Sequence, residues 1–461
     1  MAKPRTQWKC EECGKVYSQW AGVCTQCKNY NTIKEVAAAS EVASAESSGL
    51  KSGGSQKPDQ KARTLSELKS VHVERTPSGI GELDRVLGGG FVTGEVVLLA
   101  ASPGAGKSTL SLRLSEIFGK LGQSVLYSSG EESESQIKLR AERMGITEDN
   151  IHITHETNLE VLMGHMDEVQ PKFMVVDSLQ TLASSSITSS IGSITQSKEA
   201  AHTLTRLAKT RGITMVLINQ VTKGDGGDPT FAGSNQIAHI VDCVLYIESD
   251  RDSPLKFMRA TKNRFGDATE VGIFQHSETG LEEVSDPSGV LLDAGESLPG
   301  EATGFISEGI RQIPVEVQAL VAESSLTNPR KQFSSVDNAR GQIICAILDK
   351  FTELRLYDSD VFVSTTAGIR VKDPLADLAI AASILSSAKD KQTFKGRTIY
   401  IGEMTLTGRI KGSMISSKLK EAERLGFDRA VIPASAKGQI PKNMKMAVKT
   451  IDSITELPKL V

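Results

Sequence analysis

Residues 94–110 read GEVVLLAASPGAGKSTL: an apolar run, a turn with two glycines, and the start of a helical pattern. The apolar run predicts a buried strand, and the residues from Lys107 onward predict a helix. A glycine-rich turn between a strand and a helix presents backbone N–H groups that bind phosphate. The stretch therefore predicts a phosphate-binding loop (P-loop) in an α/β fold.

The loop departs from the usual pattern G-x-x-x-x-G-K-[ST], because Ala101 holds the first position. A small residue suffices there if the backbone does not need a positive φ. We expect Lys107 to reach the β- and γ-phosphates of ATP and Ser108 to bind Mg²⁺. The predicted nucleotide-binding residues are Ala101, Ser102, Pro103, Gly104, Ala105, Gly106, Lys107, Ser108 and Thr109. A chance glycine-rich turn is the alternative, which the flanking strand and helix disfavour.

Between residues 66 and 286, short apolar runs alternate with helical periods, which predicts a mainly parallel sheet. Asp177 ends the run FMVVD, where a strand's carboxyl edge meets the nucleotide, and is the second predicted Mg²⁺ ligand. Glu131 and Glu132 follow SVLYSSG, so one of them can polarise the attacking water; two solvated glutamates are the alternative. Gln220 ends ITMVLINQ and is a candidate γ-phosphate sensor, or a polar residue that merely ends a buried strand.

The N-terminal residues 1–32 contain Cys10, Cys13, Cys24 and Cys27 in the spacing C-x2-C-x10-C-x2-C. Two such pairs can present four thiolates tetrahedrally to Zn²⁺, and a segment this small needs a metal to fold. Zinc ribbons bind nucleic acid or protein, and the nearby basic residues favour neither strongly. Residues 33–65 are rich in Ala, Ser and Gly and predict a flexible linker.

The overall amino-acid composition does not by itself predict a class of binding partner. The chain has 53 Lys and Arg against 56 Asp and Glu, a net charge of -3, which neither requires nor excludes a polyanion. No signal peptide or membrane span is predicted, so we expect a cytoplasmic protein without membrane contact. Residues 287–305 are turn-rich and predict a connector, and residues 306–461 mix strands with apolar helices in an α+β pattern.

Taken together, the four-cysteine ribbon, SGIGELDRVLGGG, the P-loop, SSGEES, VVDSLQT and TKNRFG make the chain similar to the RadA (Sms) family of bacterial RecA-like recombination proteins. The similarity covers nearly the whole chain. It implies a RecA-like P-loop ATPase core that assembles as a hexameric ring on single-stranded and branched DNA. It further implies that ATP hydrolysis drives branch migration beside RecA.

The resemblance also implies roles for individual residues, which are assigned where this sequence matches the motifs of the family. Glu131 matches the catalytic glutamate, which makes Glu132 the second choice, and Gln220 matches the polar sensor, although related proteins often have histidine there. The KNRFG motif is Lys262, Asn263, Arg264, Phe265 and Gly266. Its Lys and Arg, two apart on an extended segment, point the same way and can act on a neighbouring subunit's γ-phosphate. Residues 183–198 and 221–235 match the two DNA-facing loops, with Lys198 and Lys223 as their nearby cations.

The C-terminal domain resembles the Lon protease domain. Aligned on KDPLADL, the nucleophile position holds Ala376, and aligned on GEMTLTG, the lysine position holds Ser417 with Lys418 one residue away. Both members of a Ser–Lys dyad are missing, so the prediction is an inactive scaffold that presents Lys411, Lys418 and Lys420 to DNA. A different class of function, a RecA-fold ATPase that remodels protein clients, remains open; salt-sensitive stimulation by DNA would distinguish the two.

Overall fold

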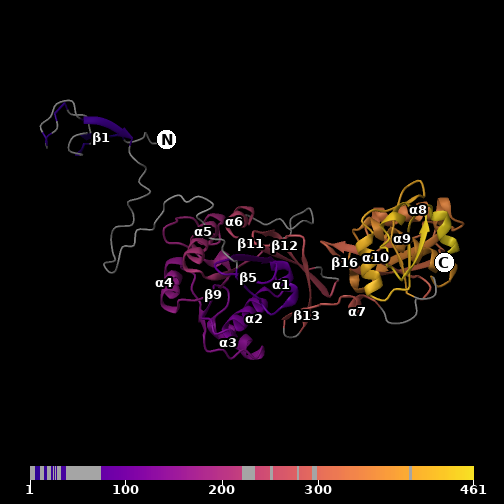
Figure 1. Cartoon of the computed structure of the whole chain (residues 1–461), viewed down its shortest axis with the longest axis horizontal. Coiled ribbons are helices and arrows are strands. Elements are labelled where there is room, and N and C mark those ends of the chain that lie inside the picture. The colour runs from indigo at the N-terminus through magenta and orange to yellow at the C-terminus, as the bar shows by residue number, and fades with distance from the viewer. Residues whose placement is uncertain are drawn as a thin grey trace. The chain divides into compact units, whose positions relative to one another are not determined.

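The computed structural model describes residues 6–10, 15–17, 22–23, 25, 27, 33–37, 74–220, 234–249, 253–277, 280–292, 298–393 and 397–460 (Figure 1). Its chain forms two compact units, Met1–Val71 and His72–Val461. Within the described ranges, no helix has both the length and the apolar composition needed to cross a bilayer.

The first unit contains a small antiparallel sheet of order β2-β1-β3. Its strands are β1 (Thr6–Cys10), β2 (Val16–Tyr17) and β3 (Ile33–Ala37). Along its whole length β3 pairs with β1, from Thr6 opposite Ala37 to Cys10 opposite Ile33. Five residues assigned to the linker by sequence therefore form part of this sheet.

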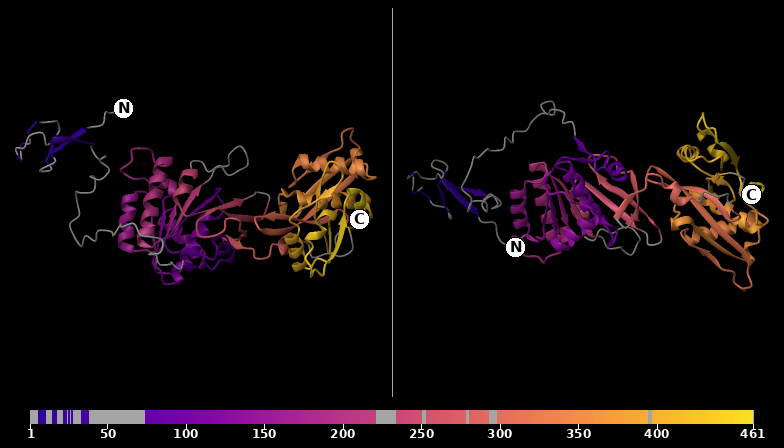
Figure 2. Two further views of the ribbon diagram at one scale, coloured as in Figure 1. Left: turned by 45° about the horizontal axis from the view of Figure 1, so that its top comes forward. Right: turned by 90° about the horizontal axis from the view of Figure 1, so that it is seen from below.

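The second unit begins with a nine-stranded sheet, here called the core sheet, of order β14-β13-β12-β11-β6-β10-β9-β7-β8 (Figures 1 and 2). Its strands are β6 (Val96–Ala101), β7 (Val125–Ser129), β8 (Ile151–Thr154), β9 (Phe173–Asp177), β10 (Thr214–Gln220), β11 (Cys243–Ser249), β12 (Leu255–Asn263), β13 (Val271–Ser277) and β14 (Gly280–Glu283). Strands β6 to β11 are parallel, whereas β12 to β14 add antiparallel hairpins. The predicted mainly parallel sheet is confirmed.

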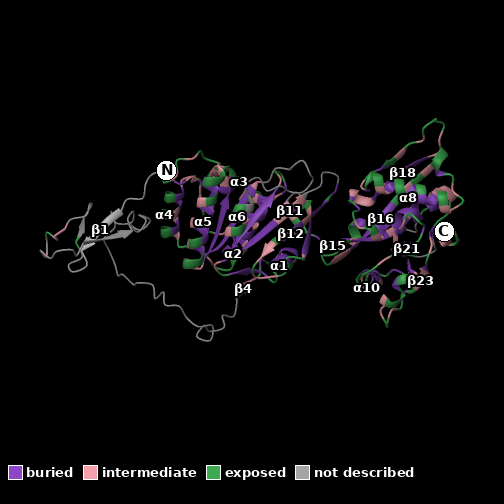
Figure 3. Cartoon of the chain, turned by 90° about the horizontal axis from the view of Figure 1, so that it is seen from above, coloured by how far each residue is buried: buried purple, intermediate pink, exposed green. Residues whose placement is uncertain are grey.

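Helices cover both faces of the core sheet because its central strands are apolar on both sides. One apolar cluster joins the sheet to α1 (Gly81–Leu87), α2 (Lys107–Lys120) and α3 (Glu134–Arg143). Another joins its opposite face to α4 (Leu159–Val169), α5 (Ile194–Arg211) and α6 (Ser234–Ile240). Figure 3 shows buried strands alongside helices whose outer sides are exposed. A two-stranded ladder, β4 (Arg75–Thr76) with β5 (Phe91–Val92), flanks α1.

A second sheet, here called the C-terminal sheet, has seven strands in the order β17-β18-β16-β15-β19-β22-β23. These are β15 (Glu301–Glu308), β16 (Arg311–Glu323), β17 (Lys331–Phe333), β18 (Ser359–Thr365), β19 (Thr398–Tyr400), β22 (Arg429–Pro433) and β23 (Ala447–Ile451). The helices are α7 (Ser288–Leu291), α8 (Asn338–Phe351), α9 (Asp377–Lys389) and α10 (Ser416–Arg424), and β20 (Glu403–Met404) pairs with β21 (Ile410–Lys411). Short 3-10 turns are η2 (Leu179–Thr181), η3 (Leu356–Asp358), η4 (Thr366–Gly368), η5 (Pro374–Ala376), η6 (Ala434–Gln439) and η7 (Ile454–Lys459).

The two sheets of the second unit share side-chain contacts. Arg311, at the start of β16, pairs with the buried Glu82 of α1, and Glu308 at the end of β15 pairs with Arg259 of β12. Apolar residues Leu255 and Ile273 of the core sheet belong to the same buried cluster as Ile306 and Ile313 of the C-terminal sheet. The predicted connector, 287–305, contains α7 and the first residues of β15.

Candidate nucleotide-binding site

Four neighbouring strands of the core sheet end at the same edge. Gln220, the last residue of β10, lies opposite Ala101 at the end of β6, and Ser129 of β7 lies opposite Asp177 of β9. Because β10 pairs with both β6 and β9, these ends are adjacent. The structure thus brings together the P-loop, Asp177, the glutamates after β7 and Gln220, which lie far apart along the chain.

The backbone conformation of the P-loop explains why positions 104 and 106 are glycine and why position 101 need not be. Gly104 and Gly106 have φ values of 76° and 91°, in the left-handed region that glycine adopts without strain. A Cβ on Gly106 would lie 2.9 Å from Cγ of Leu281 in β14, so this position is also tightly packed. Ala101 ends β6 as a regular strand residue and is not among the residues with positive φ. Alanine therefore meets the conformational requirement at the first position.

Lys107, the first residue of α2, is buried beneath the loop. Its Nζ donates to the carbonyl oxygens of Ala101 at 3.1 Å and Ser102 at 3.0 Å. Burial lowers the pKa of Lys107, while the nearby Asp177 and Glu131 act in the opposite direction. The ammonium group is thus held at the loop by weak, exchangeable acceptors, and a phosphate would be a stronger partner for it.

Asp177 and Ser108 supply the oxygen donors that Mg²⁺ prefers. The Tyr127 hydroxyl donates to Asp177 Oδ2 at 3.1 Å, and the hydroxyl of Ser108 also acts to lower the pKa of this carboxyl group. Burial raises the pKa of Asp177, although these two hydroxyls partly offset that effect. A hard cation would relieve the cost of keeping this buried carboxylate charged, so the residues present fit magnesium.

The two glutamates after β7 have different partners. Gln220 Nε2 donates to both carboxylate oxygens of Glu131, at 3.0 and 3.1 Å, whereas Glu132 pairs with Arg140 of α3. Ser129 Oγ accepts the backbone N–H groups of both glutamates and so orders the turn. Glu131 therefore lies at the strand edge with Gln220, and Glu132 is turned toward α3. A Cβ on Gly130 would lie 2.0 Å from Oγ1 of Thr181. Position 130 of the SSGEES motif therefore has room only for glycine.

The KNRFG motif begins with Lys262 and Asn263, the last two residues of β12, and lies on the side of α6. Lys262 Nζ donates to the carbonyls of Ala238, His239 and Val241, near the end of α6. Arg264 pairs with Asp242 at 3.0 Å and donates to the same carbonyl of His239. Both cations therefore point the same way, as their spacing predicts.

Asn263, Phe265 and Gly266 fix the shape of that motif. Asn263 Oδ1 accepts the N–H of Phe265 at 2.9 Å, and its Nδ2 lies near the carbonyls that end α1. A Cβ on Gly266 would lie 2.8 Å from Asn263 Nδ2. These three residues position the Lys and Arg.

Of the two loops matched to DNA contacts, only the first is described in full. Residues 183–193 fold over Gln196, whose Nε2 lies within 3.0–3.3 Å of the carbonyl oxygens of Ser184, Ile187 and Ser189. The loop is thus internally bonded and leaves serine hydroxyls and Ile191 exposed. Residues 221–233 of the second loop, with Lys223, lie outside the described residues.

The cysteine site is only partly covered. Cys13 and Cys24 lie outside the described residues; Cys10 ends β1, and Cys27 is half-buried in a turn. β1, which ends at Cys10, pairs with both β2 and β3.

The structure corrects the predicted exposure of Lys418. This residue is 1% exposed, and its Nζ bonds to Asp373 Oδ2 at 2.8 Å and to Ser307 Oγ at 2.7 Å. Lys418 lies on the inner face of α10, whereas Lys420 on the same helix and Lys411 are exposed. It therefore cannot contact DNA. Ala376, at the nucleophile position, is likewise buried.

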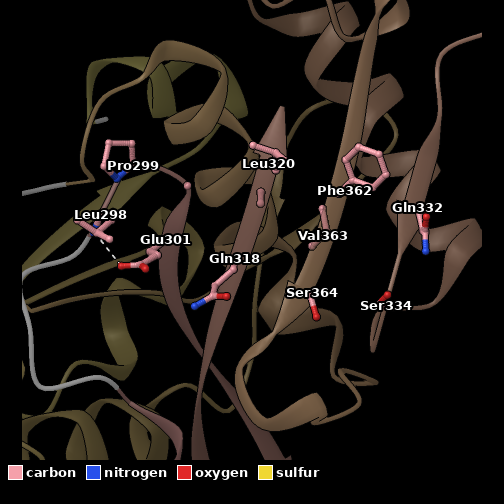
Figure 4. Close-up of a pocket in the computed structure, with 12 residues that line it drawn as sticks. Leu298, Pro299, Glu301, Gln318, Leu320, Gln332, Ser334, Phe362, Val363 and Ser364 are labelled. Atoms are coloured by element: carbon pink, nitrogen blue, oxygen red, sulfur yellow. Dashed lines mark hydrogen bonds between the residues drawn. The ribbon is translucent and has the colours of Figure 1, made fainter. Parts of the chain in front are cut away.

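A shallow cavity of about 410 Å³ lies on the C-terminal sheet (Figure 4). The residues labelled there include Leu320 and Phe362 from adjacent strands, and the N–H of Leu298 donates to Glu301 at 2.7 Å. Its lining contains no lysine, arginine, histidine or cysteine. It therefore offers no cationic side chain to bind phosphate, and no histidine or lysine to activate the hydroxyls of Ser334 and Ser364.

Sequence reasoning missed three residues at the nucleotide site. Tyr127 contacts Asp177, His276 Nε2 lies 3.2 Å from the carbonyl of Gly104, and Leu281 packs against Gly106. Tyr127 had a weak signal, a hydroxyl-bearing residue directly after the apolar pair Val125 and Leu126. His276 and Leu281 had none, because only the fold brings the β13–β14 hairpin beside a loop so much earlier in the chain.

Family models match two parts of the chain. Residues 61–226 match the AAA domain model, and residues 8–35 match the model of a rubredoxin metal binding domain. The first range contains the P-loop and the strand ends of the site, and the second contains all four cysteines.

Two relatives that match nearly the whole chain have the same description, DNA repair protein RadA. DNA repair protein RadA of Halalkalibacterium halodurans is 37% identical over 99% of both chains. DNA repair protein RadA of Mycolicibacterium smegmatis is 39% identical over 98% of both chains. Among solved structures, one described as an ATPase domain is 16% identical with a TM-score of 0.40, covering 46% of this chain and 92% of that one.

Proposed function

The chain belongs to the RadA family of DNA repair proteins, and from this premise we propose that it is a DNA-dependent motor of homologous recombination. Its fold is a RecA-like P-loop ATPase core with an N-terminal zinc ribbon, and the protein is an ATPase. What we propose beyond this is that hydrolysis moves a hexameric ring along single-stranded and branched DNA, with RecA as partner.

One observation carries the proposal: four strand ends place Lys107, Asp177, Glu131 and Gln220 around one loop. In the proposed reaction, Lys107 leaves its two carbonyl acceptors and binds the β- and γ-phosphates of ATP. Ser108 and Asp177 would hold the Mg²⁺, which supplies charge neutralisation at the phosphates. Backbone N–H groups of the loop orient the triphosphate.

Glu131 is the proposed residue that polarises the attacking water. Gln220 Nε2 donates to both carboxylate oxygens of Glu131, and Glu132 pairs with Arg140. When a γ-phosphate is present, we expect Gln220 to exchange Glu131 for the phosphate. The same amide can then report loss of the phosphate to the segment that follows β10.

Lys262 and Arg264 are proposed to act on a neighbouring subunit's nucleotide. Their side chains lie together against the end of α6, and the Arg264 side chain is 47% exposed. The guanidinium bonds through Nη1 to Asp242 and through Nη2 to the carbonyl of His239, so in this proposal it exchanges these partners for the neighbouring phosphate and stabilises the transition state in trans. Such a site is complete only between two copies, which agrees with the proposed ring.

The two accessory domains are proposed to serve DNA rather than separate reactions. Cys10, Cys13, Cys24 and Cys27 are the proposed Zn²⁺ ligands, since four thiolates are the donor set of a structural zinc site. The C-terminal domain is proposed to be a Lon-like scaffold without protease activity. Supporting this, Ala376 has no hydroxyl and the ammonium of Lys418 is ion-paired with Asp373.

ATP turnover with and without single-stranded DNA, over a salt series, tests the DNA part. We expect DNA to stimulate turnover, and the stimulation to fall steeply with salt because bound phosphates release counterions. Lys107→Ala should abolish turnover in both conditions. Turnover that ignores DNA would contradict the proposal and favour action on protein clients.

Mixing variants tests the role in trans. Glu131→Gln and Arg264→Ala should each lack turnover, because one loses its water-polarising group and the other its trans cation. A mixed ring contains interfaces where an intact Glu131 meets an intact Arg264, so mixing should restore part of the activity. No recovery on mixing, with ring formation intact, would place Arg264 outside the reaction.

A further inference from the structure

Tyr127 has a buried hydroxyl that apolar packing does not explain. It lies in the middle of β7, is 1% exposed, and packs in the cluster between the core sheet and α2. Phenylalanine would fill the same space without burying a polar atom. Burying a hydroxyl is costly unless it finds a partner, and the structure gives it Asp177 Oδ2 at 3.1 Å.

Asp177 accepts a hydrogen bond from the neighbouring strand. Tyr127 donates this bond from β7, the strand that pairs with β9. Asp177 as a whole residue is 4% exposed, so little water reaches its side chain. Groups that bond to a metal ligand rather than to the metal fix the direction in which that ligand points.

We propose that the Tyr127 hydroxyl is a positioning group: it fixes the Asp177 carboxylate so that its remaining lone pairs serve the magnesium of the bound nucleotide. The inference rests on the proposed ATPase function and adds to it a residue that acts through Asp177. Tyr127 itself touches neither the phosphates nor the reacting water in this proposal. Its loss should weaken magnesium binding without altering the phosphate contacts of Lys107.

The test is the Mg²⁺ dependence of binding of a fluorescent ADP analogue to the full chain, with Tyr127→Phe beside wild type. We expect the Mg²⁺ concentration at half-saturation to rise about tenfold. Binding in EDTA should be unchanged, and excess Mg²⁺ should restore wild-type binding. Tyr400→Phe is the matched control, since it removes the same atom from a buried tyrosine of the C-terminal sheet.

A second variant separates positioning from packing. In an Asp177→Asn background, Tyr127→Phe should cause no further change in the Mg²⁺ dependence, because the carboxylate that it positions is gone. An equal loss of binding with and without Mg²⁺, or a full effect in the Asn background, would overturn the proposal in favour of a packing role. The ratio of the affinity for the ADP analogue with Mg²⁺ to the affinity without Mg²⁺ distinguishes positioning from packing. This ratio remains measurable even if the variant is less stable.

The outcomes also distinguish this inference from its premise. Wild-type protein that binds no ADP would contradict the ATPase site itself. A Tyr127→Phe protein with wild-type Mg²⁺ dependence would overturn only the positioning role.

Discussion

At the residue scale, burial determines how the charged groups of the core sheet behave. Burial lowers the pKa of Lys107 and raises that of Asp177, because both charged forms lose water. Each still carries partners that keep it usable: carbonyls for the lysine and hydroxyls for the carboxylate. The same physics acts on Glu95, which lies at the opposite end of β6 and has no proposed role in the reaction.

Glu95 gives a prediction about pH. Burial, helped by the nearby Asp242, raises the pKa of Glu95 from 4.5 to about 7, against a hydrogen bond from Val92 N–H and the charge of Arg75. The folded state thus prefers the protonated form of Glu95. The contribution of this neutral carboxyl group to the free energy of unfolding is full below pH 4.5 and is lost as pH rises through about 7. Glu95→Gln should remove that loss and gain about 3 kcal/mol relative to wild type between about pH 5 and about pH 8.

Urea unfolding at the two pH values measures this difference. Glu142→Gln, at an exposed position on α3, is the control and should follow wild type at both. If Glu95→Gln had the same pH dependence as wild type, Glu95 would be ionised in the folded protein throughout.

At the element scale, α10 carries two lysines close together in sequence, of which one is buried and the other is exposed. Lys418 lies on the same face as Leu419 and Ala422, which are buried, whereas Lys420 faces solvent. The Lys418 ammonium contacts Asp373 at the start of η5, Ser307 of β15 and, at 3.4 Å, the carbonyl of Phe305. It therefore joins three elements of the C-terminal domain.

Lys418→Met should destabilise the protein by about 3 kcal/mol, because it leaves Asp373 half-buried without its counter-charge. Lys420→Met, on the same helix, should change the free energy of unfolding by less than about 0.5 kcal/mol. Thermal or urea unfolding compares the two. Equal effects would show that the ion pair contributes nothing to the fold.

At the scale of the whole molecule, the second unit depends on contacts between its two sheets. The side chain of Glu82 is 3% exposed; it pairs with Arg311 and also accepts the N–H of Ile273 at 2.9 Å. Glu82 lies on α1, and its own N–H donates to Glu283 of β14 at 2.9 Å. The hairpin that contacts the P-loop therefore shares partners with the start of the C-terminal domain.

Arg311→Ala should lower the stability of the second unit by about 3 kcal/mol, since it leaves the buried carboxylate of Glu82 with only the more distant, half-exposed Arg85 as its counter-charge. Arg85→Ala is the matched control: Arg85 approaches the same Glu82 at 3.6 Å, but its side chain is 46% exposed. Its loss should cost under about 1 kcal/mol. Limited proteolysis between residues 284 and 300 should increase in the first variant only; the reverse order would contradict the role of Arg311.

The sequence by itself determined the local elements and the residues of the P-loop. The apolar runs predicted β6, β7, β9, β10 and β11, and the glycine spacing predicted the loop, because strand burial and φ preference are local properties. It also predicted that alanine can replace the usual glycine at position 101 if the backbone there has no positive φ, a condition that the structure meets, and that Lys262 and Arg264 point the same way.

Only the tertiary structure decided which side chains meet. It separated Glu131 from Glu132 by giving one Gln220 and the other Arg140, and it placed Tyr127 on Asp177. It also buried Lys418, although its neighbours in sequence resemble those of an exposed lysine. The physical reason is that a partner's identity depends on strand order and helix packing between segments far apart in sequence, which no local pattern encodes.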